Sequence, residues 1–353
     1  MSTRVHTLTV AEVQRLTSDS VAVTFDVPAD LSDRYEFRPG QFLTLCREID
    51  GRDERRSYSI CAPVGRRPRV GVRLVPGGRF SQWLVNEVRP GDRIDVATPA
   101  GTFTPEPGQA DHHVLVAAGS GITPVLSIAS SLLATSDATV TLLYGNRRAD
   151  TVMFADELAD LKDEYPCRLH LVHVLSRESR EPELFSGRLD QDKLRTLCRT
   201  LIPMDEVAHW WLCGPYEMVT GAQKVLGELN VPADRVHREL FYVEDTPPAT
   251  VHHDDPAIAG QCSNVTVVLD GRSSTVPVSK DHAVLDGAQR YRPDLPFACR
   301  GGVCGTCRAR VRSGQVDMER NFALEPDEIA AGFVLTCQSR PVSDEVVLDF
   351  DSQ

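Results

Sequence analysis

Four cysteines near the C-terminus constrain this chain more than any other feature. Cys299, Cys304 and Cys307 share one glycine-rich loop and Cys337 follows later, so the spacing is C-x4-C-x2-C…C. This is the plant-type pattern in which four thiolates hold a 2Fe–2S cluster. A structural zinc module is the less favoured alternative, because zinc sites usually show two short Cys/His pairs. The loop predicts a one-electron carrier, so the rest of the chain should contain its electron source.

The first part of the chain, residues 1–108, has the pattern of a small antiparallel β-barrel. Short apolar or alternating segments at 5–13, 21–27, 41–48 and 70–75 are separated by turn signals such as Pro39-Gly40 and Pro90-Gly91. Evenly spaced short strands with Gly and Pro between them are typical of such barrels.

Two motifs on this predicted barrel suit a phosphorylated aromatic cofactor. In the strand-like run 56–59, the Arg56 guanidinium suits a phosphate and the Tyr58 ring can stack on a flat heterocycle. Gly77 and Gly78, followed by Ser81, precede a helix-like segment, and the N-terminus of a helix favours a pyrophosphate. The alternatives are a surface ion pair for Arg56 and core packing for Tyr58.

The middle of the chain, residues 109–245, alternates strand and helix. A buried strand is expected at 114–118, then the turn Gly119-Ser120-Gly121, then a helix over 125–133; Pro124 departs from the dehydrogenase fingerprint. Further strands are expected at 140–144, 168–175 and 209–212, with a helix at 154–164. This order predicts a doubly wound parallel sheet that binds a dinucleotide at its glycine turn.

The ends of the second and third predicted strands favour NADPH over NADH. NAD sites usually place Asp or Glu there for the ribose, whereas NADP sites use Arg for the extra phosphate. Arg147 follows the second strand, and Ser176 and Arg177 end the third. The alternative is that these arginines are solvated loop charges.

The last part of the chain predicts a linker and a β-grasp domain. Residues 246–262 are rich in Pro and charge and predict a semi-rigid linker. Residues 263–353 contain a hairpin signal at Asp270-Gly271, a helical segment at 282–290 and further strands at 308–312, 333–336 and 345–350.

Charge and hydropathy exclude other classes of function. The net charge of −12 argues against nucleic-acid binding. There is no apolar run long enough for a membrane span and no signal-peptide pattern, so we expect a cytoplasmic protein. We also expect the chain to be a monomer on its own.

Together with Cys213-Gly214-Pro215, these motifs resemble the ferredoxin–NADP reductase superfamily. The order of flavin barrel, nucleotide domain and C-terminal ferredoxin resembles the single-chain reductases of multicomponent oxygenases. Within that group, segments 297–307, 321–325 and 337–341 are most similar to the reductases of bacterial phenylacetyl-CoA epoxidases.

The resemblance implies two sets of cofactor residues and a small group next to the reacting rings. Those implied for the flavin are Arg56, Ser57, Tyr58, Ser59, Gly77, Gly78 and Ser81. Those implied for the nucleotide are Gly119, Gly121, Thr123, Arg147, Ser176, Arg177, Cys213 and Gly214. Glu239 and Phe241 are implied to lie near the flavin, although core packing is an equal alternative for Phe241. Tyr58, Ser59, Cys213 and Glu239 are expected to act by positioning, without acid–base chemistry.

The implied function is electron transfer from NADPH through FAD and the 2Fe–2S cluster to a di-iron oxygenase. Hydride carries two electrons and the cluster accepts one, so a flavin must lie between them. The alternatives are a steroid-ring hydroxylase or a phthalate-type dioxygenase as partner, with NADH or FMN in use, and a redox sensor without an oxygenase partner.

Overall fold

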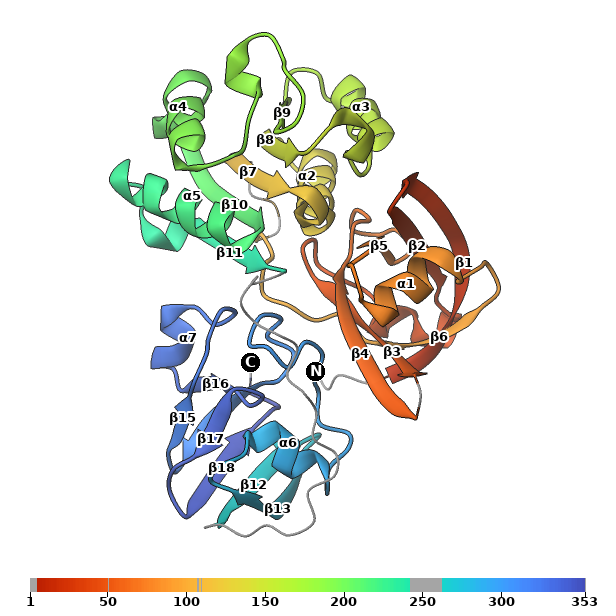
Figure 1. The fold of residues 1–353 in the computed structure, drawn as a ribbon, viewed down its shortest axis with the longest axis vertical. Coiled ribbons are helices and arrows are strands. Elements are labelled where there is room, and N and C mark those ends of the chain that lie inside the picture. Colours follow the sequence, from red (N-terminus) through yellow and green to blue (C-terminus); the bar gives the residue numbers. More distant parts are fainter. Residues whose placement is uncertain (1–4, 50, 107, 109, 242–261, 353) are drawn as a thin grey trace. The chain divides into compact units, whose positions relative to one another are not determined.

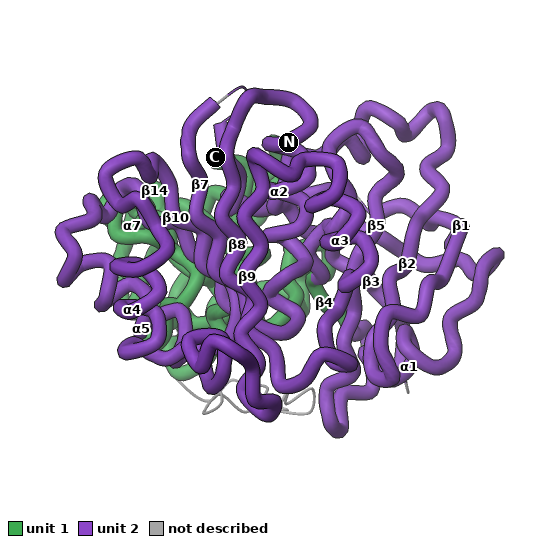
Figure 2. The backbone as a smooth tube through the Cα atoms, turned by 90° about the horizontal axis from the view of Figure 1, so that it is seen from above, with its two compact units in different colours: residues 1–4, 55–57, 243–353 green, residues 5–54, 58–242 purple. Residues whose placement is uncertain are grey.

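The structure is a computed structural model that describes residues 5–49, 51–106, 108, 110–241 and 262–352. The chain divides into two compact units (Figure 2). Residues 5–54 and 58–242 form the larger unit, and residues 1–4, 55–57 and 243–353 form the smaller one. Residues 246–261 of the predicted linker lie outside the described residues, and the predicted domain boundaries remain a prediction.

The larger unit begins with a six-stranded antiparallel sheet (Figure 1), in the order β4-β3-β6-β1-β2-β5. Its strands are β1 (Val5–Thr17), β2 (Ser20–Asp26), β3 (Phe42–Ile49), β4 (Arg52–Ser59), β5 (Arg69–Arg73) and β6 (Arg93–Ala97), and helix α1 (Arg79–Asn86) follows β5. Alternating side chains such as Val23, Phe25 and Leu43 fill its core. The predicted antiparallel flavin-type sheet is confirmed.

A five-stranded parallel sheet completes the larger unit, in the order β11-β10-β7-β8-β9. The strands are β7 (His112–Ala118), β8 (Thr139–Asn146), β9 (Leu169–Leu175), β10 (Val207–Gly214) and β11 (Val236–Leu240). Four helices accompany them: α2 (Ile122–Thr135), α3 (Ala155–Glu164), α4 (Gln191–Leu201) and α5 (Tyr216–Glu228). The doubly wound sheet is confirmed, and α4, α5 and β11 are additions to the predicted elements.

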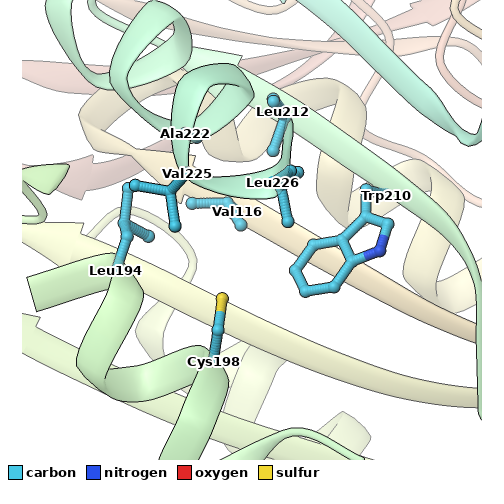
Figure 3. A pocket seen from close by; sticks show the side chains of 8 residues that line it. All are labelled: Val116, Leu194, Cys198, Trp210, Leu212, Ala222, Val225 and Leu226. Carbon is cyan, nitrogen blue, oxygen red and sulfur yellow. The ribbon is translucent and has the colours of Figure 1, made fainter. Parts of the chain in front are cut away.

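Alternation along β10 separates the two faces of this sheet. Trp211 and Cys213 pack with α2 residues in one core, whereas Trp210 and Leu212 face α4 and α5. On the α4–α5 face a small apolar cavity of about 10 Å³ remains (Figure 3). It is lined by Val116, Leu194, Cys198, Trp210, Leu212, Ala222, Val225 and Leu226. Because a cavity of roughly 10–15 Å³ is the minimum that holds one water molecule, this gap is no larger than a water site and is too small for a ligand.

The described part of the smaller unit contains a mixed sheet in the order β13-β12-β18-β14-β16. Its strands are β12 (Cys262–Leu269), β13 (Arg272–Ser279), β14 (Arg308–Ser313), β16 (Phe333–Leu335) and β18 (Glu345–Asp349), with β12 and β18 parallel. Helices α6 (Val284–Gln289) and α7 (Pro326–Ala330) and the pair β15 (Val316–Met318) and β17 (Ser339–Pro341) complete it. Asp270 and Gly271 both have positive φ, as the predicted hairpin turn requires.

Short 3-10 turns connect the elements of the larger unit. They are η1 (Ala29–Arg34), η2 (Gly119–Gly121), η3 (Ala149–Thr151), η4 (Glu183–Phe185), η5 (Met204–Glu206) and η6 (Ala233–Arg235). Among the described residues, no helix is both long and apolar enough to span a membrane.

Candidate redox sites

Strand β4 carries the predicted flavin run from Arg56 to Ser59. The Tyr58 ring is partly buried against the core of the antiparallel sheet, and its centroid lies 6.2 Å from that of Phe80 in α1. Phe80 in turn meets Trp83 edge-to-face at 5.4 Å. Strand β4 is thereby connected to the helix that follows the predicted pyrophosphate turn.

The glycine turn before α1 can offer a ligand only its backbone N–H groups. The hydroxyl of Ser81 already forms hydrogen bonds within the turn. Gly77 has a φ of 74°, which favours glycine, and Gly78 precedes the first residue of α1 without a side-chain cap. The buried Ser81 hydroxyl donates to the Gly78 carbonyl at 3.0 Å and accepts from the Val75 N–H at 3.1 Å. Ser81 therefore holds the shape of the turn, and the N–H groups that begin α1 are the groups suited to an anion.

The nucleotide turn packs directly on the neighbouring strand. Gly119 has a φ of 56°, and a Cβ added at Gly121 would come within 2.2 Å of the Cys213 carbonyl oxygen in β10. Only glycine allows this approach at position 121. The buried Thr123 hydroxyl donates to the Ser120 carbonyl at 3.0 Å, which closes the turn at the start of α2.

The ends of three strands bring together three residues of the predicted reaction group. Ser59 Oγ, at the end of β4, donates to Glu239 Oε2 at 3.1 Å. Glu239 lies in β11 and pairs in register with Cys213 of β10, whose side chain is fully buried. Tyr58 precedes Ser59 on the same strand, so all four predicted positioning residues lie in this part of the larger unit.

Burial dominates the electrostatics of this group. Desolvation raises the pKa of the Glu239 carboxyl to about 8, and the hydrogen bond from Ser59 opposes that rise. Burial also raises the pKa of the Cys213 thiol well above its ordinary value, and the nearby Glu239 adds to the effect. The Cys213 thiol is neutral at physiological pH, whereas the Glu239 carboxyl titrates near physiological pH.

The predicted NADPH residues meet at the carboxyl edge of the parallel sheet. The Arg177 N–H donates to the Arg147 carbonyl at 2.8 Å, and the Ser176 N–H donates to the Asn146 carbonyl at 2.9 Å. The side chains of Arg147 and Arg177 are exposed and have no ion-pair partner among the described residues. The adjacent Arg148, in contrast, is paired with Asp150.

Arg73 is a candidate residue that the sequence did not indicate. A Cβ at Gly119 would lie 3.3 Å from Arg73 Nη1, and Arg73 Nη2 donates to the Thr151 carbonyl at 2.7 Å. Its Nε also contacts Asp19 at 3.3 Å. Arg73 belongs to β5 of the antiparallel sheet, so only the folded structure reveals a cation next to the nucleotide turn.

Gly214 and Phe241, the last two predicted residues of the nucleotide domain, both lie in packed surroundings. A Cβ at Gly214, whose φ is 157°, would come within 2.8 Å of Met218 Cε and 3.2 Å of the Ala118 nitrogen. Phe241 is partly buried against the core of the parallel sheet. This contact agrees with the core-packing alternative for Phe241, and a role near the flavin stays a prediction.

In the smaller unit, the cluster loop aims backbone N–H groups at sulfur. Cys299 Sγ accepts from the N–H groups of Gly301 and Cys304, both at 3.4 Å, and Cys304 Sγ accepts from the Cys299 N–H at 3.5 Å. Gly302 and Gly305 have φ values of 77° and 66°. These left-handed residues curl the loop around its own thiols.

The four sulfurs interact as two pairs. Hydrogen bonding with Cys304 lowers the pKa of the Cys299 thiol to about 6, and the same interaction raises that of Cys304. Cys337 likewise raises the pKa of the Cys307 thiol. Within the described ranges, no three Cys, His, Asp or Glu side chains form a site for a single metal ion. Two sulfur pairs with converging N–H groups suit a two-iron cluster, which needs four thiolates.

Comparison with known protein families assigns each sheet to a domain type. Residues 7–104 match the oxidoreductase FAD-binding domain, and residues 115–224 match the oxidoreductase NAD-binding domain. Residues 267–342 match the 2Fe-2S iron-sulfur cluster binding domain. The chain is therefore an oxidoreductase with flavin, nicotinamide nucleotide and iron–sulfur domains.

Full-length relatives narrow this class. The chain is 42% identical to a component of the 1,2-phenylacetyl-CoA epoxidase from Escherichia coli K12, over 99% of both chains. It is 35% identical to the ferredoxin reductase component of 3-ketosteroid-9-alpha-monooxygenase from Rhodococcus rhodochrous, over 97% of this chain and 96% of that one. The chain belongs to the family of oxygenase reductase components that these relatives represent, which confirms the predicted resemblance.

Solved structures support the fold. Phthalate dioxygenase reductase superposes with a TM-score of 0.60 at 24% identity, and the match covers 98% of both chains. An intact type IV self-sufficient cytochrome P450 monooxygenase gives a TM-score of 0.70 at 24% identity, over 98% of this chain and 41% of that one. The predicted three-part fold class is confirmed.

Proposed function

We propose that this chain passes electrons from NADPH through FAD and a 2Fe–2S cluster to a di-iron oxygenase, and that this oxygenase is a phenylacetyl-CoA epoxidase. The proposal of this partner rests on the full-length similarity to the component of the Escherichia coli epoxidase. It includes action in the cytoplasm as a monomer that meets its oxygenase transiently.

The hydrogen bond between Ser59 and Glu239 is the observation that carries the electron-transfer proposal. It joins the end of the flavin-sheet strand β4 to the nucleotide-sheet strand β11, and Cys213 pairs with Glu239. Hydride transfer requires the nicotinamide and the flavin to meet, so residues of both predicted sites must converge. In the larger unit they do so within hydrogen-bond distance.

The cofactors supply the redox chemistry, and this chain supplies binding and orientation. When bound, these cofactors would supply hydride donation, the exchange of two-electron for one-electron chemistry, and one-electron transfer. Arg56 and the start of α1 would hold the flavin phosphates, with Tyr58 against the ring. The turn from Gly119 to Gly121, with Arg73 next to it, would hold the nucleotide pyrophosphate. The four cysteines would hold the cluster.

Two exposed guanidinium groups support the preference for NADPH. Arg147 and Arg177 lie on adjacent loops at the carboxyl edge of the sheet, where the adenosine ribose binds in doubly wound folds. Neither side chain is committed to a carboxylate among the described residues. A 2′-phosphate would satisfy both charges, whereas a ribose hydroxyl would not.

The partner is tested by reconstitution. The purified protein, with NADPH, should support product formation by a phenylacetyl-CoA epoxidase oxygenase at a rate well above that with a 3-ketosteroid 9α-hydroxylase oxygenase. The steroid enzyme is the second candidate because its reductases are 35% and 36% identical to this chain. Rapid reduction of cytochrome c without coupling to either oxygenase would favour a redox sensor.

The cofactors are tested separately from the partner. Acid extraction should release FAD and not FMN, and the oxidised protein should show the visible absorption of a 2Fe–2S centre. A colourless zinc-containing ferredoxin unit would contradict the cluster. Tyr58→Ala should lower the retained flavin, and full flavin content with full cytochrome c reduction in that variant would contradict the flavin site.

A further inference from the structure

The side chain of Gln338 connects the two segments that carry the four cysteines. Its Nε2 lies 2.8 Å from the Arg300 carbonyl oxygen and 3.0 Å from the Cys337 carbonyl oxygen. The same nitrogen lies 3.8 Å from Cys337 Sγ. Arg300 follows the first cysteine of the loop and Gln338 follows the last cysteine of the set, so one amide connects the backbone next to Cys299 with Cys337.

The backbone fixes Gln338 in this position. Its N–H donates to the Leu335 carbonyl at 2.9 Å, and its carbonyl accepts from the Glu319 N–H at 2.9 Å. The aliphatic part of the side chain lies close to the cluster loop, because a Cβ at Gly302 would come 3.0 Å from Gln338 Cγ. The glycine at 302 therefore leaves the space through which the side chain passes.

The carbonyl at Arg300 needs this donor. Arg300 is a non-glycine residue with a φ of 53°, a conformation that L-residues adopt only where their surroundings hold it. Contacts at both ends of the residue hold it. The guanidinium pairs with Asp286 and contacts Gln289, and the carbonyl accepts from Gln338. Loss of the Gln338 amide would release the backbone end next to Cys299.

We propose that Gln338 is a positioning residue that holds Cys337 against the cluster loop and raises the reduction potential of the 2Fe–2S cluster. This inference rests on the proposed cluster. Reduction adds one negative charge to the cluster, and an N–H dipole next to a ligand sulfur stabilises that charge. The amide nitrogen has two protons for the Arg300 and Cys337 carbonyl oxygens and Cys337 Sγ, so the proton directed at the Cys337 backbone is shared with the sulfur 3.8 Å away.

Two substitutions separate this role from simple space filling. Gln338→Glu keeps the shape but replaces the donor with acceptor oxygens that face two carbonyls and a sulfur. Gln338→Met keeps the length and removes the dipole. Gln315→Met is the matched control, since Gln315 is an exposed glutamine of the same unit whose hydrogen bonds, to Val342, Ser343 and the Ser343 hydroxyl, come from its backbone.

The experiment is an EPR-monitored redox titration of the full-length, cluster-loaded protein, with iron content and visible absorption measured on each variant. We expect the equilibrium constant for one-electron reduction to fall about tenfold in Gln338→Glu, or about 59 mV, and by a smaller factor in Gln338→Met. The EPR spectrum of the reduced cluster should change in both variants. The control should keep the wild-type potential and spectrum.

Loss of the cluster is also informative. If the Gln338 variants lose iron while the control keeps it and FAD content is unchanged, the positioning role is supported. Wild-type potentials and EPR spectra in both Gln338 variants would overturn the proposal, and so would equal changes in the control. A wild-type protein without a 2Fe–2S spectrum would instead contradict the cluster itself.

Discussion

The nucleotide turn at 119–121 and the cluster loop at 299–307 are both glycine-rich and both direct backbone N–H groups, but they are held differently. Gly121 lies directly against the backbone of β10, where a Cβ would meet the Cys213 carbonyl at 2.2 Å. In the cluster loop, a Cβ at Gly305 would meet nothing closer than Ala323 Cβ at 3.7 Å. The cluster loop is held by its φ values and by hydrogen bonds to sulfur.

The difference shows that a glycine-rich motif has two separate physical causes. At the nucleotide turn the space is missing, so substitution should act through the packing of the sheet. At Gly305 of the cluster loop the space exists, so substitution there should act through the positive φ and through the ligands and amides that the loop orients. The same letters in a sequence therefore predict different consequences of mutation.

Removing a ligand from the cluster loop should have the largest effect. Cys304→Ser takes one sulfur from the pair with Cys299, and electron transfer to the oxygenase should fall by at least about a hundredfold. Reduction of ferricyanide by NADPH should persist, because the flavin can supply it alone. Cys167→Ser is the control, since Cys167 is exposed and outside both sites. Equal loss of both activities would contradict the proposal that the flavin site works without the cluster.

Gly121→Ala, in the nucleotide turn that packs on β10, should have the next largest effect. The clash with the Cys213 carbonyl forces the turn away from β10, at a cost of about 2–4 kcal/mol of stability. The KM for NADPH should rise, as seen in initial-rate measurements, and the thermal midpoint should fall. Gly227→Ala in α5 is the matched control, because a Cβ there meets nothing within 4 Å. That control should be neutral or slightly stabilising.

Sequence reasoning reached the strand–turn–helix order of the parallel sheet and the cysteine loop, because both depend on local patterns. It did not reach the contact of Ser59 with Glu239, which are 180 residues apart. It placed Arg147 and not Arg148 at the nucleotide site, but it did not predict the ion pair that distinguishes them. Their sequence context is the same, and only the folded loop pairs Arg148 with Asp150. Contacts set by tertiary packing leave no periodic signal in the sequence.

Removing Arg147 or Arg177 tests the loops that follow β8 and β9, next to the strand that leads into the nucleotide turn. Arg147→Ala or Arg177→Ala should raise the KM for NADPH about tenfold, or about 1.4 kcal/mol, because the 2′-phosphate loses a charge partner. The KM for NADH should not change. Arg148→Ala is the control, since its guanidinium is paired with Asp150. A wild-type preference for NADH, or an equal effect on both nucleotides, would contradict the assignment.

Ser59→Ala should have the smallest effect. It probes the charge of the buried Glu239 carboxyl, next to the strand on which the nucleotide turn packs. The folded pKa of Glu239 is about 8, above the value of 4.5 for an ordinary glutamate. Because the folded pKa is raised, this contribution to stability is fully present below about pH 4.5 and is lost as the pH rises through about 8.

The hydrogen bond from Ser59 favours the ionised carboxylate, so Ser59→Ala should increase the loss of stability between pH 5 and 8 by about 1 kcal/mol. Glu239→Gln should remove that part of the pH dependence, because the amide carries no charge in either state. Thermal midpoints of the three proteins across this pH range provide the measurement. Parallel pH profiles for all three proteins would mean that Glu239 is solvated in the folded protein. Its pKa would then not be raised by burial.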